Sequence, residues 1–396
     1  MTNQKSSNKI KKIAIFSHNY AQTSGWDDEF ISYLLAQNKF NIVNIRFPFV
    51  ASKDGAITIN FYKLQEKHSK KSIIRFYRPE VVSYIKDFIL GMYYGIKYCR
   101  NYDLFVGLNN LLVLVGIVLK KIGWIKKVVY CMIDYTPRRY QNSVLNRIYY
   151  FIDRLACEQA DVIWPLHQAM IDGRVRDKKI NPSKINFFIT PSGNNSDHYT
   201  DQDYKQNSQF TIIYFGGIVK SKGAELFIPI AKKLLARQIT NFKFECIGPG
   251  QIEDLKKEII ENNLTPYFKV YGPIEDMKTI EQKLLTYGVA IAPYYSQDKN
   301  NFSFYADPGK VKIYLGAGLP IVITDVPPIA KDIVKQQAGL IAEYSATDFA
   351  DKIIQIWAPQ NYSNFRKNAI IMGQRFAWSK IFNSALSHLD QSVDLD

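Results

Sequence analysis

Two glycine-rich segments of this chain each carry a lysine that could contact a phosphate. In the first, "YFGGIVKSKGAELFI" (214–228), Gly216 and Gly217 end an apolar run, and Lys222 and Gly223 follow. A strand that ends in glycine and leads into a helix turns bare backbone N–H groups and the positive end of the helix dipole toward an anion. Bare backbone with one nearby cation suits a pyrophosphate. The segment therefore predicts phosphate binding by Gly216, Gly217 and Lys222.

The second segment, "YADPGKVKIYLGAGLPIVITD" (305–325), has Gly309 and Lys310 at the start of an expected helix. Glycine is unfavourable in a helix unless another group must approach the backbone closely. We interpret that group as a nucleotide diphosphate, with Lys310 as a second cation and Gly309 opening the first amides of the helix to it. Gly316 and Gly318 have a simpler explanation in close helix–strand packing and in a helix C-cap.

Segments of strand length alternate with helical segments in both halves of the chain, which predicts parallel sheets covered by helices on both faces. In the first half, the expected strands are 10–18, 40–47, 102–108, 128–134, 161–166 and 185–191, with helices at 28–38 and 142–159. In the second half, the expected strands are 210–217, 242–248, 267–272, 288–294, 319–325 and 339–344, with helices at 223–237, 251–263, 276–286 and 346–357. The polar stretch 190–209 between the two series predicts a linker.

This pattern predicts an α/β protein with two Rossmann-like, doubly wound domains. We expect the first domain over 1–192 and the second over 193–375, with a C-terminal helix at 376–396 that packs back onto the first. Ligands of such sheets bind outside the carboxyl ends of the strands. The expected site is therefore a central cleft that the two domains face.

The composition limits the other possibilities. The 4 cysteines have no paired spacing and the 5 histidines form no metal motif, so we expect no disulfide framework, no metal site and a reducing compartment. The N-terminal stretch lacks the features of a signal peptide. The longest apolar stretch, 104–123, is interrupted by glycine and asparagine, so it predicts a buried strand, a turn and a buried helix in place of a membrane-spanning helix.

The net charge of +15 implies an anionic partner, namely nucleic acid, anionic lipid or a phosphorylated substrate. Nucleic acid is disfavoured because no motif for it is present. Basic and aromatic residues alternate with apolar ones in 70–86 and 120–127. Such segments suit a membrane interface, but an ordinary solvated basic face would have the same composition. We expect a cytoplasmic chain, peripheral at the inner face of the membrane.

Several motifs resemble those of the retaining glycosyltransferases of family 4 (group 1), which have the GT-B fold. The segment 214–228 is similar to "VGRLxxxKGxxxLI", and "IGPGQIEDLKK" (247–257) is similar to "IGxGxxxxxL". The segment "DPGKVKIYLGAGLPIVITD" (307–325) is similar to "xPxKxxEYxAxGxPVVaTd", and "RFAWSKIFNSAL" (375–386) resembles the family's C-terminal crossing helix. The resemblance extends over nearly the whole chain. It implies metal-independent, retaining sugar transfer from a UDP- or GDP-linked sugar, with no other cofactor.

The resemblance assigns the donor to the second domain, where Lys222 would meet the diphosphate and Gly272 and Pro308 also match donor-site motifs. The family's first arginine falls on Gly217, so one cation is missing. The two glutamates of its Glu-x7-Glu motif fall on Tyr305 and Ile313. Isoleucine cannot accept a hydrogen bond from the donor ribose, and losing that acceptor would cost about 1–3 kcal/mol.

We expect other groups to take over the work of the missing glutamates. Asp307, near the first glutamate position, could substitute for it, as could backbone carbonyls around 304–307. The expected catalytic residues are Asp134, Asp307 and Tyr305.

The resemblance assigns the acceptor to the first domain. The loop "SHNYAQTSGWDDEF" (17–30) aligns with a glycine-rich loop of the family, and we expect acceptor contacts from His18, Ser24 and Gly25. Asp27 or Asp28 would cap the following helix. Asp134 could orient a hydroxyl, or it could pair with one of the next two arginines as a structural ion pair. Arg138 and Arg139 could instead bind a phosphate of a lipid-linked acceptor.

The sequence thus predicts a glycosyltransferase that moves a hexose from a nucleotide sugar to a glycan or lipid-linked acceptor at an anionic membrane surface, in polysaccharide biosynthesis. The departures at Gly217, Tyr305 and Ile313 leave a non-catalytic scaffold on the same fold open. A nucleotide-sugar epimerase would also bind the donor but would need no membrane acceptor.

Overall fold

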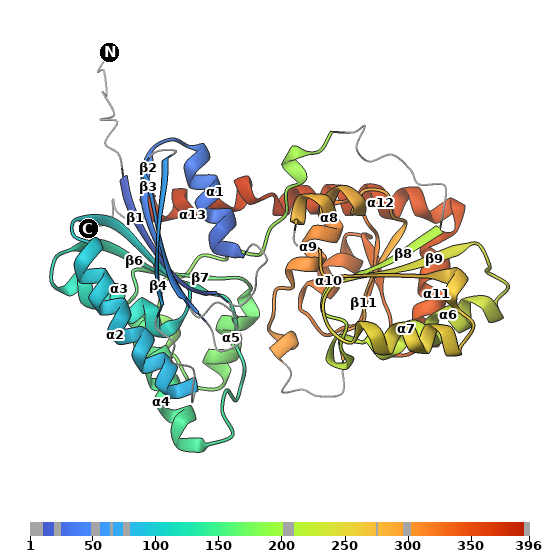
Figure 1. The fold of residues 1–396 in the computed structure, drawn as a ribbon, viewed down its shortest axis with the longest axis horizontal. Helices are drawn as coiled ribbons and strands as arrows, with labels where there is room; N and C mark the ends of the chain where they lie inside the picture. The colour runs from blue at the N-terminus through green and yellow to red at the C-terminus, as the bar shows by residue number, and fades with distance from the viewer. Residues whose placement is uncertain are drawn as a thin grey trace, which may run out of the picture. The chain divides into compact units, whose positions relative to one another are not determined.

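In the computed structural model, the chain divides into two compact units (Figure 1). The structure describes residues 11–19, 25–48, 56–63, 66–73, 80–200, 210–274, 276–295 and 302–391. One unit contains the chain up to Thr190 and the chain from Phe382 on, and the other is Pro191–Ile381. Each unit contains one α/β sheet.

The sheet of the first unit has seven strands in the order β4-β3-β2-β1-β5-β6-β7. The strands are β1 (Lys11–Asn19), β2 (Phe40–Pro48), β3 (Ala56–Lys63), β4 (Glu66–Ile73), β5 (Tyr102–Gly107), β6 (Ile125–Met132) and β7 (Val162–Pro165). Strands β2, β1, β5, β6 and β7 are parallel, as predicted, whereas β3 and β4 are antiparallel. The sequence did not predict this edge because β4, "EKHSKKSI", is polar on both faces. The strand predicted over 185–191 is wrong, since only the single bridge Ile163–Phe187 forms there.

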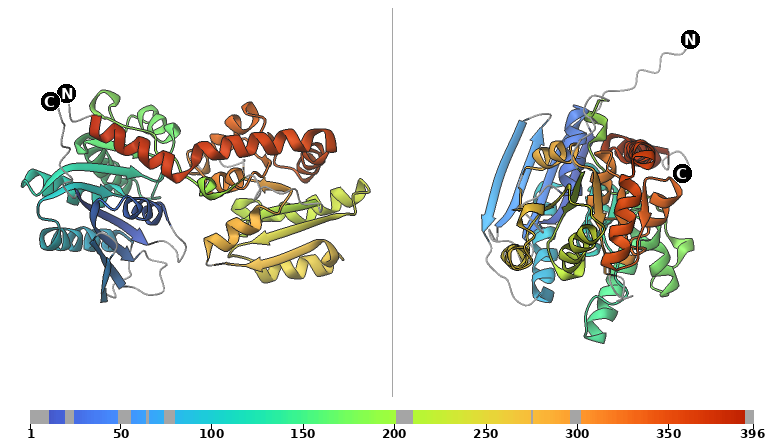
Figure 2. Two further views of the ribbon diagram at one scale, coloured as in Figure 1. Left: turned by 90° about the horizontal axis from the view of Figure 1, so that it is seen from above. Right: turned by 90° about the vertical axis from the view of Figure 1, so that its right-hand side faces the viewer.

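Helices cover both faces of this sheet (Figures 1 and 2). They are α1 (Trp26–Ala36), α2 (Glu80–Tyr98), α3 (Asn110–Lys121), α4 (Ser143–Gln159), α5 (Gln168–Arg176) and the second part of α13 (Trp378–Gln391). Phe105 packs against Gly116 of α3, whereas Leu104 faces Leu386 of α13 across a cavity. Adjacent residues of a strand point to opposite faces, so α3 and α13 lie on opposite faces.

The strand β5 and the helix α3 confirm the interpretation of 104–123 as a buried strand, a turn and a helix. Asn109 caps α3 by accepting a hydrogen bond from the Leu112 N–H. Within the described residues, no helix has the length and apolarity needed to span a membrane.

The sheet of the second unit has six strands, all parallel, in the order β10-β9-β8-β11-β12-β13. The strands are β8 (Phe210–Phe215), β9 (Phe242–Ile247), β10 (Phe268–Gly272), β11 (Val289–Ala292), β12 (Ile321–Ile323) and β13 (Gly339–Ile341). One core joins Ile212 and Tyr214 to α6 (Phe227–Ala236), α7 (Ile252–Glu261) and α11 (Ala346–Trp357). The other core joins Ile213 to α8 (Met277–Leu284), α9 (Gly309–Gly316), α10 (Ile329–Lys335) and α12 (Pro359–Gly373). Helices on both faces confirm the predicted doubly wound class (Figure 1).

The described part of 190–209 is not a free linker, because it packs into the second unit. Asn194 is buried, and its side-chain amide donates to the carbonyls of Lys312 (2.9 Å) and Gly373 (3.0 Å). A Cβ on Gly316 would lie 2.7 Å from Asn194 Cγ, so Gly316 allows a close approach, though to this segment and not to a strand. Gly318, with φ +70°, follows α9 in the left-handed conformation expected of a C-cap.

Candidate functional site

Tyr314 of α9 is hydrogen-bonded to the backbone at the carboxyl end of β8. The Tyr314 hydroxyl lies 2.6 Å from the Phe215 nitrogen, which donates to it, and 3.2 Å from the Phe215 oxygen, to which it donates. Lys310 lies one helical turn before Tyr314, so both side chains share a face of α9. A Cβ on Gly216 would lie 3.7 Å from Lys310 Nζ. The structure therefore places the Lys310 ammonium over the bare backbone at the end of β8.

The second predicted cation lies in the same place. Lys310 Nζ is 4.2 Å from the centre of the Tyr214 ring and 4.8 Å from that of Tyr294. Lys222 Nζ is 5.3 Å from the Tyr294 ring centre and 4.4 Å from that of Phe302. Tyr294 thus contacts both lysines. Among the residues that the structure describes, no carboxylate forms an ion pair with either ammonium.

Burial lowers the pKa of both lysines. Loss of hydration, together with the neighbouring Lys222 charge, lowers the pKa of Lys310 to about 7. Loss of hydration also lowers the pKa of Lys222. Two desolvated ammonium groups without a carboxylate favour an anion that contacts both.

The glycines have different roles in this arrangement. The Gly216 N–H already donates to the Ile247 carbonyl (2.9 Å), so it is not available to donate to a phosphate. What Gly216 contributes is the absence of a side chain. A Cβ on Gly217 would meet nothing within 4 Å, so there is open space beside this residue. Gly223 has φ +80°, and a Cβ there would lie 2.1 Å from the Pro293 oxygen. Gly272 ends β10, which β9 separates from β8, so the structure does not place it with the lysines.

The helix expected from Gly223 begins only at Phe227, which corrects the predicted helix-dipole contact there. Lys222 lies in a 3₁₀ turn over 220–222, and a second turn over 224–226 precedes α6. Gly223 joins the two turns in the left-handed conformation. The other expected helix, α9, does begin at Gly309 as predicted, with Lys310 in its first turn and with Pro308 before it in an extended conformation (φ −72°, ψ 111°).

The remaining residues of the second segment differ in exposure. There is free space beside Gly309, since a Cβ added to it would lie 4.0 Å from the Ser192 side chain. Tyr305 is half-buried, and its N–H donates to the Phe302 carbonyl (3.0 Å). Ile313 packs against the core of the second unit. Its side chain has no hydrogen-bond acceptor to offer a ribose hydroxyl.

Asp307 is a correction to the predicted catalytic set. Its Oδ1 lies 3.0 Å from Lys312 Nζ, and its Oδ2 accepts the Ser192 N–H at 2.7 Å. Both side chains of the ion pair are almost fully buried, with exposed fractions of 2% and 0%. Since both oxygens are taken, Asp307 holds the 190s segment against α9 and is not free to replace a missing glutamate.

The predicted acceptor residues near α1 also have structural partners. His18 is buried, with Nε2 3.0 Å from Asp87 Oδ2 and with Nδ1 in contact with the Asn109 side-chain amide. This network takes up both ring nitrogens, which corrects the expected contact with a hydroxyl. Gly25 is itself the N-cap of α1, and its N–H donates to Asp28 (3.0 Å). Ser24 lies outside the described residues.

The loop after β6 contains three of the predicted site residues, Asp134, Arg138 and Arg139. Asp134 is exposed, and the described part of the chain contains no ion pair between it and Arg138 or Arg139. The Arg138 guanidinium donates to the carbonyls of Tyr140 (3.2 Å) and Gln141, so it stabilises its own loop. Arg139 Nη2 donates to the Tyr84 hydroxyl (3.3 Å). Burial raises the pKa of the Asp134 carboxyl, against the opposing effect of the Arg139 and Arg174 charges.

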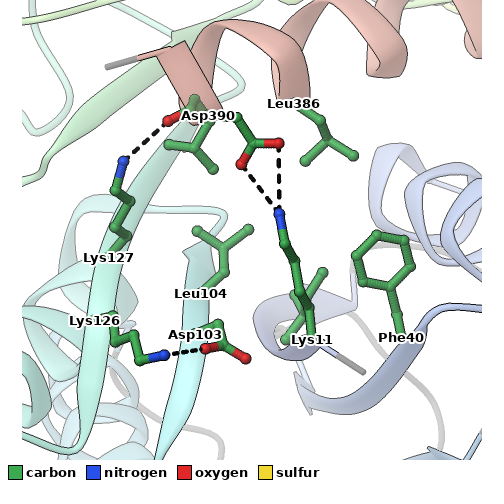
Figure 3. A pocket seen from close by; sticks show the side chains of 10 residues that line it. Lys11, Phe40, Asp103, Leu104, Lys126, Lys127, Leu386 and Asp390 are labelled. Atoms are coloured by element: carbon green, nitrogen blue, oxygen red, sulfur yellow. Dashed lines mark hydrogen bonds and ion pairs between the residues drawn. The ribbon is translucent and has the colours of Figure 1, made fainter. Parts of the chain in front are cut away.

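Figure 3 shows a cavity of about 250 Å³ between α13 and the amino ends of β1, β5 and β6. Its charged groups neutralise one another through Lys11–Asp390 (3.1 Å) and Lys126–Asp103 (2.6 Å). Lys127 donates to the Leu389 carbonyl (2.9 Å). Substrates of parallel sheets bind at the opposite, carboxyl edge. This cavity is therefore a weaker candidate than the lysine pair.

Sequence reasoning missed the aromatic side chains that complete the site. Tyr214 also fixes the open glycine, since its hydroxyl donates to the Gly217 carbonyl (2.8 Å). Tyrosines at a strand end or inside a helix match ordinary core positions, so no local signal distinguishes them. No cluster of three His, Cys, Asp or Glu that could hold a metal occurs among the described residues.

Comparison with known proteins supports the resemblance for the second half of the chain. Residues 209–358 match the family model described as glycosyl transferases group 1. No curated protein is a significant match to the chain. Among solved structures, similar ones include sucrose-phosphate synthase from Thermosynechococcus elongatus, with a TM-score of 0.72, 15% identity, and coverage of 98% of this chain and 100% of that one.

Two further structures were solved with nucleotides. The E. coli trehalose-6-phosphate protein bound with UDP-2-fluoro glucose has a TM-score of 0.70 and 10% identity, with coverage of 96% of this chain and 99% of that one. Anabaena HepE in complex with UDP has a TM-score of 0.66 and 13% identity, with coverage of 96% and 100%. At these identities the structures establish the GT-B fold.

Proposed function

We propose that this chain, a group 1-like glycosyltransferase of the GT-B fold, binds a nucleotide-diphosphate sugar at the lysine pair of its second unit and transfers the sugar to a glycan acceptor. One observation carries the proposal: Lys222 and Lys310 lie together at the carboxyl end of β8, beside open glycine backbone and without a carboxylate partner in the described residues. Both the UDP complex and the UDP-2-fluoro glucose complex of the similar structures favour UDP as the nucleotide to test first.

The proposed chemistry follows from charge. As the bond between the anomeric carbon and the diphosphate oxygen breaks, negative charge grows on the leaving diphosphate. The two ammonium groups stabilise that charge, so the step needs no metal ion. Lys310 takes the place of the arginine that is missing at Gly217.

We propose that transfer is retaining, with departure and attack on one face of the sugar. In this scheme the leaving phosphate takes the proton of the acceptor hydroxyl as the new glycosidic bond forms, so no enzyme nucleophile is needed. Asp134, exposed after β6, is the first-unit group that we propose to orient the acceptor. Backbone carbonyls near Tyr305 would bind the ribose hydroxyls that Ile313 cannot. The acceptor is a lipid-linked glycan, and the chain acts at the cytoplasmic face of a membrane.

Isothermal titration calorimetry with UDP, GDP and their sugars tests the donor site. We expect one nucleotide to bind the wild-type chain, and we expect Lys310→Met to weaken it about tenfold or more, as for loss of a charge-assisted hydrogen bond. Lys257→Met, on exposed α7, is the matched control and should bind like wild type. If no nucleotide binds, the non-catalytic scaffold is the better account.

Donor affinity is expected to fall as the pH rises. The pKa of Lys310 is about 7 without a ligand, and a bound diphosphate raises it by favouring the ammonium form. A UDP-sugar does not titrate in this range, so its Kd should increase roughly tenfold per pH unit above 7, until the pKa of the complex is reached. Titrations at pH 6 to 9 would measure this slope. In Lys310→Arg the slope should disappear, and a slope that persists would contradict the assignment.

A further inference from the structure

We infer that the outward side of the layer formed by α2, α3 and α4 in the first unit binds an anionic lipid surface. This inference rests on the membrane part of the proposed function and identifies where the chain would meet the membrane. The residues that carry it belong to a different unit from the lysine pair.

Helix α2 has an apolar side that no described element covers. One side carries the buried Ser83, Asp87 and Gly91. The opposite side is formed by residues spaced three or four apart, with exposed fractions from 37% to 60%: Val82, Ile85, Ile89, Tyr93 and Ile96. A helix on the surface of a soluble domain normally has polar residues there. A row of large exposed apolar side chains therefore indicates a binding surface.

The neighbouring helices extend this apolar side. Close contacts of Gly91 with Val115 and of Gly95 with Leu119 pack α2 against α3, and α3 in turn packs against α4 (Figure 1). The exposed apolar residues of these two helices are Val118 at the end of α3, Ile122 just after it, and Val144, Ile148 and Phe151 on α4. Because the three helices form one layer on the sheet, their outward sides face the same way.

The charges on this surface favour anionic lipid. Among the residues of these three helices whose exposure is described, every exposed charged residue is basic. They are Lys97, Lys121, Arg147 and Arg154. The aspartates of the layer are buried in ion pairs, Asp87 with His18 and Lys86, and Asp153 with Arg174. Lys97 Nζ lies 5.4 Å from the ring centre of the exposed Tyr93.

Basic groups beside aromatic and aliphatic side chains suit the headgroup region of a bilayer. A second copy of the chain fits less well. A two-fold interface through this layer would bring the same basic residues together, and among the residues of these helices whose exposure is described the one acid that is not buried, Glu158, is only half-buried.

Vesicle co-sedimentation of the full chain tests the surface. With vesicles of phosphatidylcholine and phosphatidylglycerol, we expect Ile85→Gln/Ile89→Gln to weaken partitioning at least about tenfold, because two large apolar side chains no longer insert. The matched control is Ile260→Gln/Ile371→Gln, which changes isoleucines with exposed fractions of 65% and 44% in the second unit and should bind vesicles like wild type. UDP affinity should be unchanged in both variants.

The basic residues give an independent measurement. Lys97→Gln/Lys121→Gln should lose about fivefold in partitioning per charge at low salt, and the difference should disappear at high salt or without phosphatidylglycerol. Equal losses in the Ile260→Gln/Ile371→Gln control would overturn the inference. So would sedimentation velocity that shows a vesicle-free dimer dissociated by Ile85→Gln/Ile89→Gln. Failure of nucleotide binding with intact vesicle binding would instead contradict the donor site alone.

Discussion

Replacing Lys222 by methionine is expected to lower kcat/KM for sugar transfer at least about a hundredfold, the usual loss when one group that stabilises developing negative charge is removed. Methionine keeps the length and most of the apolar contact with Tyr294 and Phe302, so the change removes the charge and little else. The rate of UDP release from a UDP-sugar, with a glycan acceptor or with water, measures the effect. The loss should exceed the loss in donor affinity, because the charge on the diphosphate grows during bond cleavage.

The chain provides a close control for this variant. Lys220 lies in the same 3₁₀ turn as Lys222 but is exposed, and none of the described rings lies under its ammonium group. Lys220→Met should retain wild-type kcat/KM. If Lys220→Met and Lys222→Met lost activity equally, the effect would come from the turn or from the overall charge, and the phosphate contact would be ruled out.

Replacing Asp307 by alanine is expected to lower the free energy of unfolding by about 3–5 kcal/mol, because it leaves the buried Lys312 ammonium without its carboxylate. The Ser192 N–H also loses its acceptor. Urea unfolding followed by tryptophan fluorescence would measure the change. The double variant Asp307→Ala/Lys312→Met should recover most of the loss, since replacing both partners of a buried ion pair by apolar groups is often neutral.

Asp325→Ala serves as the matched control, since Asp325 is exposed just after β12 in the same unit. It should change the free energy of unfolding by no more than about 0.5 kcal/mol. The opposite pattern, a stable Asp307→Ala protein that binds donor but transfers no sugar, would show that the carboxylate belongs to the catalytic machinery after all.

The second unit could be predicted closely from the sequence. Its six strands are three to six residues long and mostly apolar, and their alternation with helices suffices to identify a parallel sheet, although α10 and α12 were not predicted. The first unit was less predictable at its edge. The strands β3 and β4 form an antiparallel extension. The outer strand, β4, has hardly any apolar residues, so only its pairing with β3 makes it a strand.

The residues of the proposed donor and acceptor sites also differ in how well the sequence predicts their surroundings. Lys222, Lys310 and Gly217 are recognisable by residue type and spacing, because phosphate chemistry needs cations and bare backbone. Asp307 and His18 were misjudged, since a polar residue near a strand end has the same local sequence whether it faces substrate or fills a buried pair. That choice depends on Lys312, Ser192 and Asp87, which only the folded chain brings within 3.0 Å.

The amino-acid sequence by itself therefore determined the class of fold, the group 1 resemblance and the two cations of the proposed donor site, because each follows from short-range pattern and residue chemistry. Tertiary structure alone decided which polar groups are already paired and which apolar residues remain uncovered. Hydrogen bonding and burial depend on neighbours far apart in the chain. The exposed isoleucines of α2 and the buried carboxylate of Asp307 are the two clearest cases.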